Sequence, residues 1–272
     1  MDPGSDRLDE HRLDGLEWLG VDEISHGADH RFLTCVADHA TGAIVWAAPG
    51  RNAAALQAFF DLLTDEQKAS IRAVSIDMSA GYENAIRKNV PDAQVCFDPF
   101  HVIGLGGRAV DKVRRGEWNT HGRSGTPTGT WIKGTRWSLL KDPANQTVRQ
   151  LAKLAEVMQT NKRLFRSMLL LNELRWIYRV ARHEAPERLE AWLAWASRSK
   201  LKPFVALART IRKHQPGVLA AIELGLSNGR LEGLNSKVRL LSHRAYGFAS
   251  ADALIATIYL CCAGITIPLP HR

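Results

Sequence analysis

The sequence predicts an α/β fold, a mixed five-stranded sheet with helices packed on it. An all-helical insertion should separate the sheet from the C-terminal helices of the same core. Short apolar runs, turn signals and amphipathic stretches alternate over the first hundred residues, whereas residues 119–226 show helical spacing and no convincing strand. The 272 residues are 45% hydrophobic and 24% charged, which is a globular balance. A chain of this length can form one large domain or two small ones.

The first three strands are predicted at residues 18–24, 31–37 and 43–48, each an apolar run. Residues 38–42 (DHATG) have turn composition, so the second and third strands should form a hairpin. The first strand should pair antiparallel with them across a loop at residues 25–30.

The next elements should alternate between helix and strand. Apolar residues recur at helical spacing over residues 52–63, with Asn52 as a plausible N-cap. The order that follows is a strand at 73–78, a helix at 81–89, a strand at 93–97 and a helix at 101–118. A meander leading into two crossover units is the order of the ribonuclease-H-like fold.

The all-helical insertion is predicted from residue 119 to residue 226. A polar stretch at residues 121–130 leads to helices at 146–159, 162–183, 186–199 and 202–214, and the chain then returns to helices at 228–241 and 251–262. The predicted division is a tail at 1–14, the first part of the core at 15–118, the insertion at 119–226, the C-terminal helices of the core at 227–265, and a tail at 266–272.

Charge, cysteine usage and hydropathy indicate the class of partner and the cellular compartment. Lys and Arg outnumber Asp and Glu by 36 to 28, which favours a polyanion such as nucleic acid, although charge alone gives only about even odds. The four cysteines show no C-x-x-C spacing, so we expect neither a zinc knuckle nor a disulfide framework, and this is typical of a protein of the reducing cytoplasm. We expect no signal peptide and no membrane partner, because residues 1–6 lack an apolar core and the longest apolar run, 253–269, is interrupted and short of the ~20 residues of a span.

Two aspartates stand where the predicted sheet would place a metal site. Asp22 lies late in the first strand and Asp77 lies at the end of the fourth, and these strands are neighbours in this fold. Two close carboxylates repel unless a cation intervenes, and oxygen ligands select Mg²⁺ or Mn²⁺. Two such ions, about 3.5–4 Å apart, can drive phosphodiester chemistry. One aspartate alone would more often be a turn or cap residue, whereas two at matched positions favour the metal site.

Glu232 is the third acidic candidate. Its helix carries an apolar stripe and, about 90° away, a polar stripe of Asn228, Glu232, Asn235 and Arg239. If the apolar stripe packs on the sheet, Glu232, Asn235 and Arg239 should face the two aspartates. The alternative is an ordinary solvated helix face, against which the poor helix formers of its first two turns argue slightly.

Asp98 and His101 follow the fifth strand at a strand-to-helix junction. They could steer a water, a phosphate or the surroundings of a metal. Alternatively, Asp98 caps the following helix and His101 packs in its first turn, and the sequence leaves these two interpretations about equal.

Basic residues of the insertion form a candidate DNA-binding face. Arg175, Arg179 and Arg182 share one side of a predicted helix, with Trp176 and Tyr178 alongside, and Arg with aromatics suits phosphate contact and base stacking. A salt-bridged helix surface is the more frequent explanation. Lys237 and Arg244 are further candidates for contacting DNA.

Seven motifs together resemble one known family. They are residues 18–23 (WLGVDE), 30–34 (HRFLT), 75–82 (SIDMSAGY), 97–102 (FDPFHV), 133–137 (KGTRW), 227–235 (SNGRLEGLN) and 244–248 (RAYGF). In this order they resemble the DDE transposases of the ISL3 (ISL-three) type of bacterial insertion sequences, over roughly residues 15–265.

The resemblance implies a function and roles for residues. Asp22, Asp77 and Glu232 would correspond to the acidic triad that binds two Mg²⁺ or Mn²⁺ ions, and Asp98 with His101 would match a D-x-x-H element. The partners would be double-stranded DNA, as terminal inverted repeats and target DNA, and further copies of the chain in a homo-oligomer on DNA. The activity would be cleavage of DNA at the element ends and transfer of the strands to target DNA. It would take place in the bacterial cytoplasm, at the nucleoid.

One departure from the family pattern bears on activity. Relatives carry a cysteine-containing zinc-binding segment and a helix-turn-helix region before the catalytic domain, whereas Met1 here precedes Asp22 by only 21 residues. We therefore expect a shortened copy or a misplaced start, and the alternative function is a non-catalytic DNA-binding remnant or regulator of the full-length enzyme. A nucleotide-binding α/β enzyme is a poor third interpretation, because residues 104–107 (GLGG) lack the G-x-G-x-x-G frame.

Overall fold

The computed structural model describes residues 12–26 and 31–263, which divide into two compact units. The sheet unit comprises the described parts of Met1–Asp98 and Leu224–Arg272, and the helical unit is Pro99–Glu223. The predicted tail at 266–272, residues 1–11 of the predicted N-terminal tail and most of the predicted loop at 25–30 lie outside the described residues.

The sheet unit contains the predicted mixed five-stranded sheet. Its strands run in the spatial order β3-β2-β1-β4-β5, with β1 antiparallel to β2, β2 antiparallel to β3, and β1, β4 and β5 mutually parallel. The strands are β1 Trp18–His26, β2 Arg31–Asp38, β3 Ile44–Pro49, β4 Ala73–Ile76 and β5 Gln94–Phe97. The hairpin, the antiparallel pairing of the first strand with it and the neighbouring position of the first and fourth strands are therefore confirmed.

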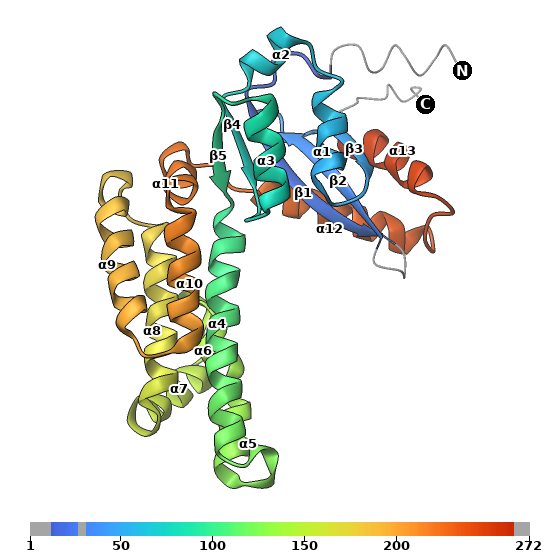
Figure 1. Ribbon diagram of the computed structural model, residues 1–272. Coiled ribbons are helices and arrows are strands. Elements are labelled where there is room, and N and C mark those ends of the chain that lie inside the picture. Colours follow the sequence, from blue (N-terminus) through green and yellow to red (C-terminus); the bar gives the residue numbers. More distant parts are fainter. Residues whose placement is uncertain (1–11, 27–30, 264–272) are drawn as a thin grey trace. The chain divides into compact units, whose positions relative to one another are not determined.

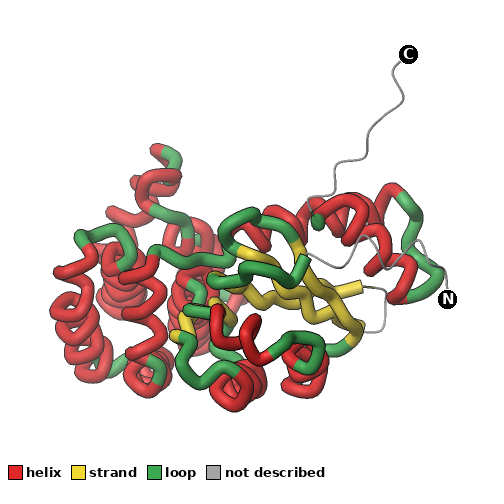
Figure 2. Tube along the Cα trace, turned by 90° about the horizontal axis from the view of Figure 1, so that it is seen from above, coloured by secondary structure: helices red, strands yellow, loops and turns green. Residues whose placement is uncertain are grey.

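Helices cover both faces of this sheet (Figures 1 and 2). On one face, α12 (Gly229–Arg244) and α13 (Ala251–Cys262) pack their apolar residues against Ile24, Cys35 and other inward side chains of β1, β2 and β3. The other helices of the unit are α1 Ala53–Phe60, α2 Asp65–Ser70 and α3 Ala80–Asn89.

Local sequence explains where α1 and α2 begin. The Asn52 side chain accepts a hydrogen bond from the Ala55 amide, so it is the N-cap that the sequence predicts. Phe59 lies on the buried face of α1, and its ring centroid is 5.7 Å from that of Trp46 of β3. α2 was not predicted from the sequence, although Thr64 and Gln67 form a capping box at its start.

The helical unit contains no β-strand among Pro99–Glu223, as expected. Its α-helices are α4 Pro99–Thr120, α5 Pro127–Gly134, α6 Arg136–Leu140, α7 Val148–Thr160, α8 Lys162–Ile177, α9 Ala185–Arg198, α10 Lys202–Lys213 and α11 Gln215–Leu224, with 3₁₀ turns η2 Arg123–Gly125, η3 Pro143–Asn145 and η4 Arg182–Glu184. Close packing of α4 on α8 depends on Gly106, because a Cβ there would lie 2.9 Å from Leu171 Cδ1 and 3.0 Å from Leu174 Cδ2.

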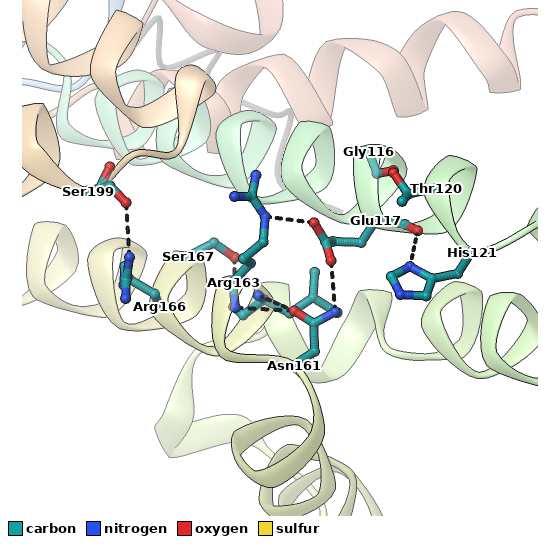
Figure 3. Close-up of polar contacts among 10 residues, drawn as sticks. Gly116, Glu117, Thr120, His121, Asn161, Arg163, Arg166, Ser167 and Ser199 are labelled. Carbon is teal, nitrogen blue, oxygen red and sulfur yellow. Dashed lines mark hydrogen bonds and ion pairs between the residues drawn. The ribbon is translucent and has the colours of Figure 1, made fainter.

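A polar cluster ties α4 to the start of α8 (Figure 3). Glu117 of α4 accepts hydrogen bonds from Asn161 Nδ2 at 2.9 Å and from Arg163 Nε at 2.7 Å. The Asn161 side chain also caps the first amides of α8. This cluster fixes the register between two helices that are forty residues apart in sequence.

Three expectations about the helical part need correction. The boundary was expected after residue 118, but α4 belongs to the helical unit, which begins at Pro99. The predicted helix at 162–183 ends at Ile177, and α5, α6 and α11 were not predicted. The glycines of residues 104–107 lie inside α4 rather than in a phosphate-binding loop, which removes the nucleotide-binding interpretation.

No helix within the described part of the chain is both long enough and apolar enough to span a membrane.

Candidate active site

Asp22 lies on the face of β1 that α12 covers. Side chains alternate along a strand, so Gly20, Asp22 and Ile24 share one face, and Ile24 belongs to the core beneath α12 and α13. Asp22 Oδ2 accepts a hydrogen bond of 2.7 Å from Asn235 Nδ2 of α12, and Oδ1 accepts one of 2.8 Å from the Glu23 amide. The polar stripe of α12 therefore meets β1 at Asp22.

Asp77 follows β4 at the matching position of the neighbouring strand. The last registered pair between these parallel strands is Gly20 with Ser75, so Asp22 and Asp77 each lie two residues beyond it. Ser75 is buried and its hydroxyl hydrogen-bonds to the Asn228 side chain, which is on the α12 side of the sheet. The two aspartates thus emerge at one edge of the sheet.

A buried polar network holds the beginning of α12 against β1, β4 and the residue that follows β5. Asn228 Nδ2 donates to the Val21 carbonyl at 3.1 Å, and the Asn228 amide donates to Asp98 Oδ1 at 2.9 Å. His39 Nε2 lies 2.7 Å from Ser75 Oγ, and burial lowers the pKa of His39 below its ordinary value although the Asp38 carboxylate opposes this. Because buried polar groups are costly unless paired, this network fixes α12 strongly.

Gly20 lets α12 approach this closely. A Cβ at Gly20 would lie 2.8 Å from Leu231 Cδ1, 3.0 Å from His39 Nε2 and 3.1 Å from Asn228 Oδ1. Only glycine leaves room for the helix and the network together.

Glu232 is half-buried and lies on α12 between the two asparagines that contact β1. Asn228, Glu232 and Asn235 are spaced by four and three residues, so their side chains share one helix face. The structure therefore brings Glu232 to the side of the helix that faces β1. The direct meeting of all three carboxylates remains a prediction.

Glu23 is an acidic neighbour that the sequence analysis did not single out. It lies one residue after Asp22 and so points to the opposite face, where it accepts a hydrogen bond of 3.2 Å from the Tyr82 hydroxyl of α3. Burial raises the pKa of Glu23; the negative charges of Asp77 and Asp22 raise it further, while the Tyr82 hydrogen bond opposes them. Negative charge is therefore concentrated at this edge of the sheet.

The donors at this edge fit a hard divalent cation in kind. They are carboxylate oxygens, which Mg²⁺ and Mn²⁺ prefer. Within residues 12–26 and 31–263, however, no group of three or more His, Cys, Asp or Glu side chains is arranged to hold a metal ion together. Asp22 is instead oriented by Asn235.

Arg239 lies on the exposed side of α12, four residues beyond Asn235. It lines a hollow of about 530 Å³ together with Arg31, His243 and apolar residues of β1 and α13. Ile24 and Ser25, which directly follow Asp22 and Glu23 in β1, also line this hollow. The basic residues of the hollow are therefore neighbours of the acidic residues of β1.

Asp98 and His101 are placed differently. Asp98 is buried, and its carboxylate accepts the Asn228 amide, which supports a role in holding α12. His101 lies in the first turn of α4, with its ring centroid 5.8 Å from that of Phe100.

The basic candidates are partly engaged in ion pairs. Arg179 Nη2 lies 2.6 Å from Asp142 Oδ2, and Arg175 Nε lies 3.9 Å from the same oxygen. Arg182 is exposed but belongs to η4, so the three arginines do not share one helix. Lys237 donates to the Cys261 carbonyl at 2.5 Å, and Arg244 is exposed at the end of α12.

Comparison with known families now identifies the class of protein. The model of the ISL3-type DDE family, described as transposase, matches residues 19–258, which include both sheet-unit segments and the helical unit. The chain therefore belongs to this transposase family, as its motifs predict.

Individual relatives agree with this assignment. The chain is 39% identical to the transposase for insertion sequence element IS1557 of Mycobacterium tuberculosis, over 96% of this chain and 63% of that protein. It is 33% identical to the transposase for insertion sequence element IS1001 of Bordetella parapertussis, over 87% of this chain and 59% of that protein. The chain thus spans less than two thirds of the length of these relatives.

Proposed function

We propose that this chain cuts DNA at the ends of an insertion sequence and joins those ends to target DNA. In this proposal the sheet unit is a ribonuclease-H-like core and the helical unit is its insertion. Terminal inverted repeats and target DNA are the substrates, and the active form is a homo-oligomer on DNA. Membership of the transposase family and the acidic edge of the sheet support the proposal.

Asp22, Asp77 and Glu232 are the residues that would hold Mg²⁺ or Mn²⁺. Two divalent ions at such a site supply activation of the attacking oxygen and stabilisation of the leaving oxygen in phosphodiester chemistry. If the three carboxylates meet as proposed, they would repel one another, and this repulsion would favour cation binding.

The remaining residues of the site orient these acids. Asn235 holds the Asp22 carboxylate through one oxygen, which limits its rotation. The bonds of Asn228 to Val21 and Asp98 hold the first turn of α12, and with it Glu232, against β1. Arg239 and the basic hollow beside it provide positive charge for a DNA phosphate next to the acidic edge.

One observation carries the proposal. Asn235 of α12 hydrogen-bonds to Asp22 of β1 although the two residues are 213 positions apart, so the helix that bears Glu232 lies against the acidic strand. If α12 served only to cover the apolar core, its polar stripe would be expected to face solvent rather than the Asp22 carboxylate.

The test combines metal binding with DNA cleavage. Millimolar Mn²⁺ should raise the melting temperature of the wild type, because an ion bound only by the folded state stabilises it. Asp77→Asn keeps the side-chain shape and removes one anionic ligand, so it should lose most of this shift and should lose Mn²⁺-dependent nicking of supercoiled plasmid DNA. Asp92→Asn, at an exposed turn position, is the matched control and should behave as wild type.

Two outcomes would contradict the proposal. Asp77→Asn that is clearly less stable than wild type in EDTA would make Asp77 a structural cap. DNA binding by the wild type without any metal-dependent nicking would instead favour the non-catalytic regulator.

A further inference from the structure

The helical unit contains a basic hollow of about 590 Å³ along one side of α4. Five of its lining residues are cationic and one is acidic: Arg108, Lys112, Arg115, Arg136 and Arg175, with Asp111. Arg108, Lys112 and Arg115 are exposed and spaced by four and three residues, so they form a single stripe on the helix. We call this surface the α4 groove.

The positive charge of the α4 groove is not balanced within the groove. Asp111 is shared by Arg114 at 2.7 Å, Arg115 at 2.8 Å and Arg136 at 3.7 Å. These arginines hold the pKa of Asp111 below its ordinary value despite its burial, so it stays ionised and still offers only one negative charge. Like charges on one helix face repel, and a polyanion is the partner that relieves such repulsion.

Two glycines deepen the groove without serving the packing of the unit. A Cβ at Gly104 would lie 3.7 Å from Arg108 Nη1, and one at Gly107 would lie 3.8 Å from Leu140 Cδ2, which are ordinary contacts. The contrast is with Gly106, where α8 leaves no room for a Cβ. Glycine is a poor helix former, so its use at two groove positions that would accept alanine indicates a close approach from outside.

From these observations we propose that the α4 groove binds the sugar–phosphate backbone of DNA. Arg108, Lys112 and Arg115 contact successive phosphates, and the surface above Gly104 and Gly107 lets the strand lie close to the helix. Phe100, which is 62% exposed at one end of the groove, offers a flat apolar surface to a sugar or base. This inference rests on the proposed function for its substrate, and it assigns DNA contact to α4 rather than to the Arg179–Arg182 segment.

The first arm of the test removes charge. Binding of a short labelled DNA duplex is measured by fluorescence anisotropy in EDTA over a range of KCl concentrations, with the full chain. Arg108→Gln combined with Lys112→Gln should weaken binding by about tenfold and reduce the slope of log Kd against log salt by about two. Arg209→Gln combined with Lys213→Gln is the matched control, because it removes two exposed charges at the same spacing from α10 and should change binding little.

The second arm fills the groove without changing charge. Gly104→Gln and Gly107→Gln should weaken DNA binding several-fold while the melting temperature stays equal or rises, because glutamine is a better helix former. Gly116→Gln, on the same helix with no atom near its Cβ position, should raise the melting temperature and leave binding unchanged.

The outcomes separate this inference from the proposed function. Groove variants that bind DNA no more weakly than their controls, or a wild type that prefers polyglutamate to duplex DNA, would overturn the inference. Because binding is measured in EDTA, it does not depend on cleavage. A wild type that shows groove-dependent binding but no Mn²⁺-dependent nicking would therefore contradict only the proposed chemistry.

Discussion

Asp22 and Glu23 are adjacent in sequence but serve opposite faces of β1. Asp22 meets Asn235 of α12, whereas Glu23 meets Tyr82 of α3. The sequence allowed the first contact to be predicted, because the polar stripe of α12 can be read from its spacing. The role of Glu23 could not be predicted, because it depends on which face of the sheet α3 covers.

Glu23→Gln should stabilise the protein at neutral pH. The pKa of Glu23 is raised above its ordinary 4.5, so the folded state holds this proton more tightly than the unfolded state does. Stability from this group is therefore lost as pH rises through the raised pKa, where burial and the charges of Asp77 and Asp22 oppose ionisation. Glutamine keeps the oxygen that accepts the Tyr82 hydrogen bond and removes the charge.

Thermal melts between pH 4 and pH 8 check this. The melting temperature of Glu23→Gln should exceed that of wild type at pH 7, and the difference should close as the pH falls below 4.5, where both states of the wild type are protonated. Glu223→Gln, at an exposed position, should show no such pH-dependent difference. A Glu23→Gln protein less stable than wild type at pH 7 would show that the carboxylate charge is stabilising.

The docking of α12 onto β1 is the element-level feature on which the site depends. Gly20 has no side chain where Leu231, His39 and Asn228 converge. A methyl group there has to displace the helix or break the network, and overpacking of this kind costs about 1–3 kcal/mol.

Gly20→Ala should therefore lower the free energy of unfolding by about 1–3 kcal/mol. Gly233→Ala, on α12 with no atom near its Cβ position, should raise it by up to about 1 kcal/mol, since alanine is the better helix former. Urea denaturation of both variants measures the two effects. Equal stability of Gly20→Ala and wild type would mean that α12 does not press on this position.

Elements with local signals were predicted well, and those with ambiguous signals were not. Asn52 marks the start of α1 through its own side chain, and short apolar runs between turn residues mark the strands. The polar composition of residues 121–130 hides the start of α5, although Thr126 caps this helix and Pro127 occupies its first turn. α11 begins at Gln215, directly after the predicted helix at 202–214, and it was not predicted as a separate helix. The α12 network could not be predicted at all, because Asn228 bonds to Val21 and Asp98 only once the sheet is assembled.

At the scale of the whole molecule, the helical unit is one continuous segment and the sheet unit is made of two. The helical unit has its own core, in which Trp192 donates to the Leu170 carbonyl and Phe204 and Ile211 are fully buried. Continuity and a separate core are the properties of a segment that folds independently.

A fragment of residues 99–223 should therefore unfold cooperatively on its own. The expected result is a helical circular-dichroism spectrum and a single thermal transition. In this fragment, Trp192→Ala should lower the free energy of unfolding by about 3–5 kcal/mol, because it leaves a cavity in the core. A fragment with helical signal but no cooperative transition would show that the helical unit needs the sheet unit in order to fold.

The split of the sheet unit also sets the order in which the site can form during protein synthesis. Asp22 and Asp77 leave the ribosome with the sheet, whereas Glu232 is added 155 residues after Asp77. At about 5–20 residues per second, roughly 8–31 s therefore separate the synthesis of Asp77 from that of the third acidic residue. Throughout that interval the apolar face of β1, β2 and β3 lacks α12 and α13, which form its cover in the finished molecule. A chain released before residue 232 would hold the two aspartates without their partner helix, so the proposed chemistry becomes available only after α12 has been synthesised.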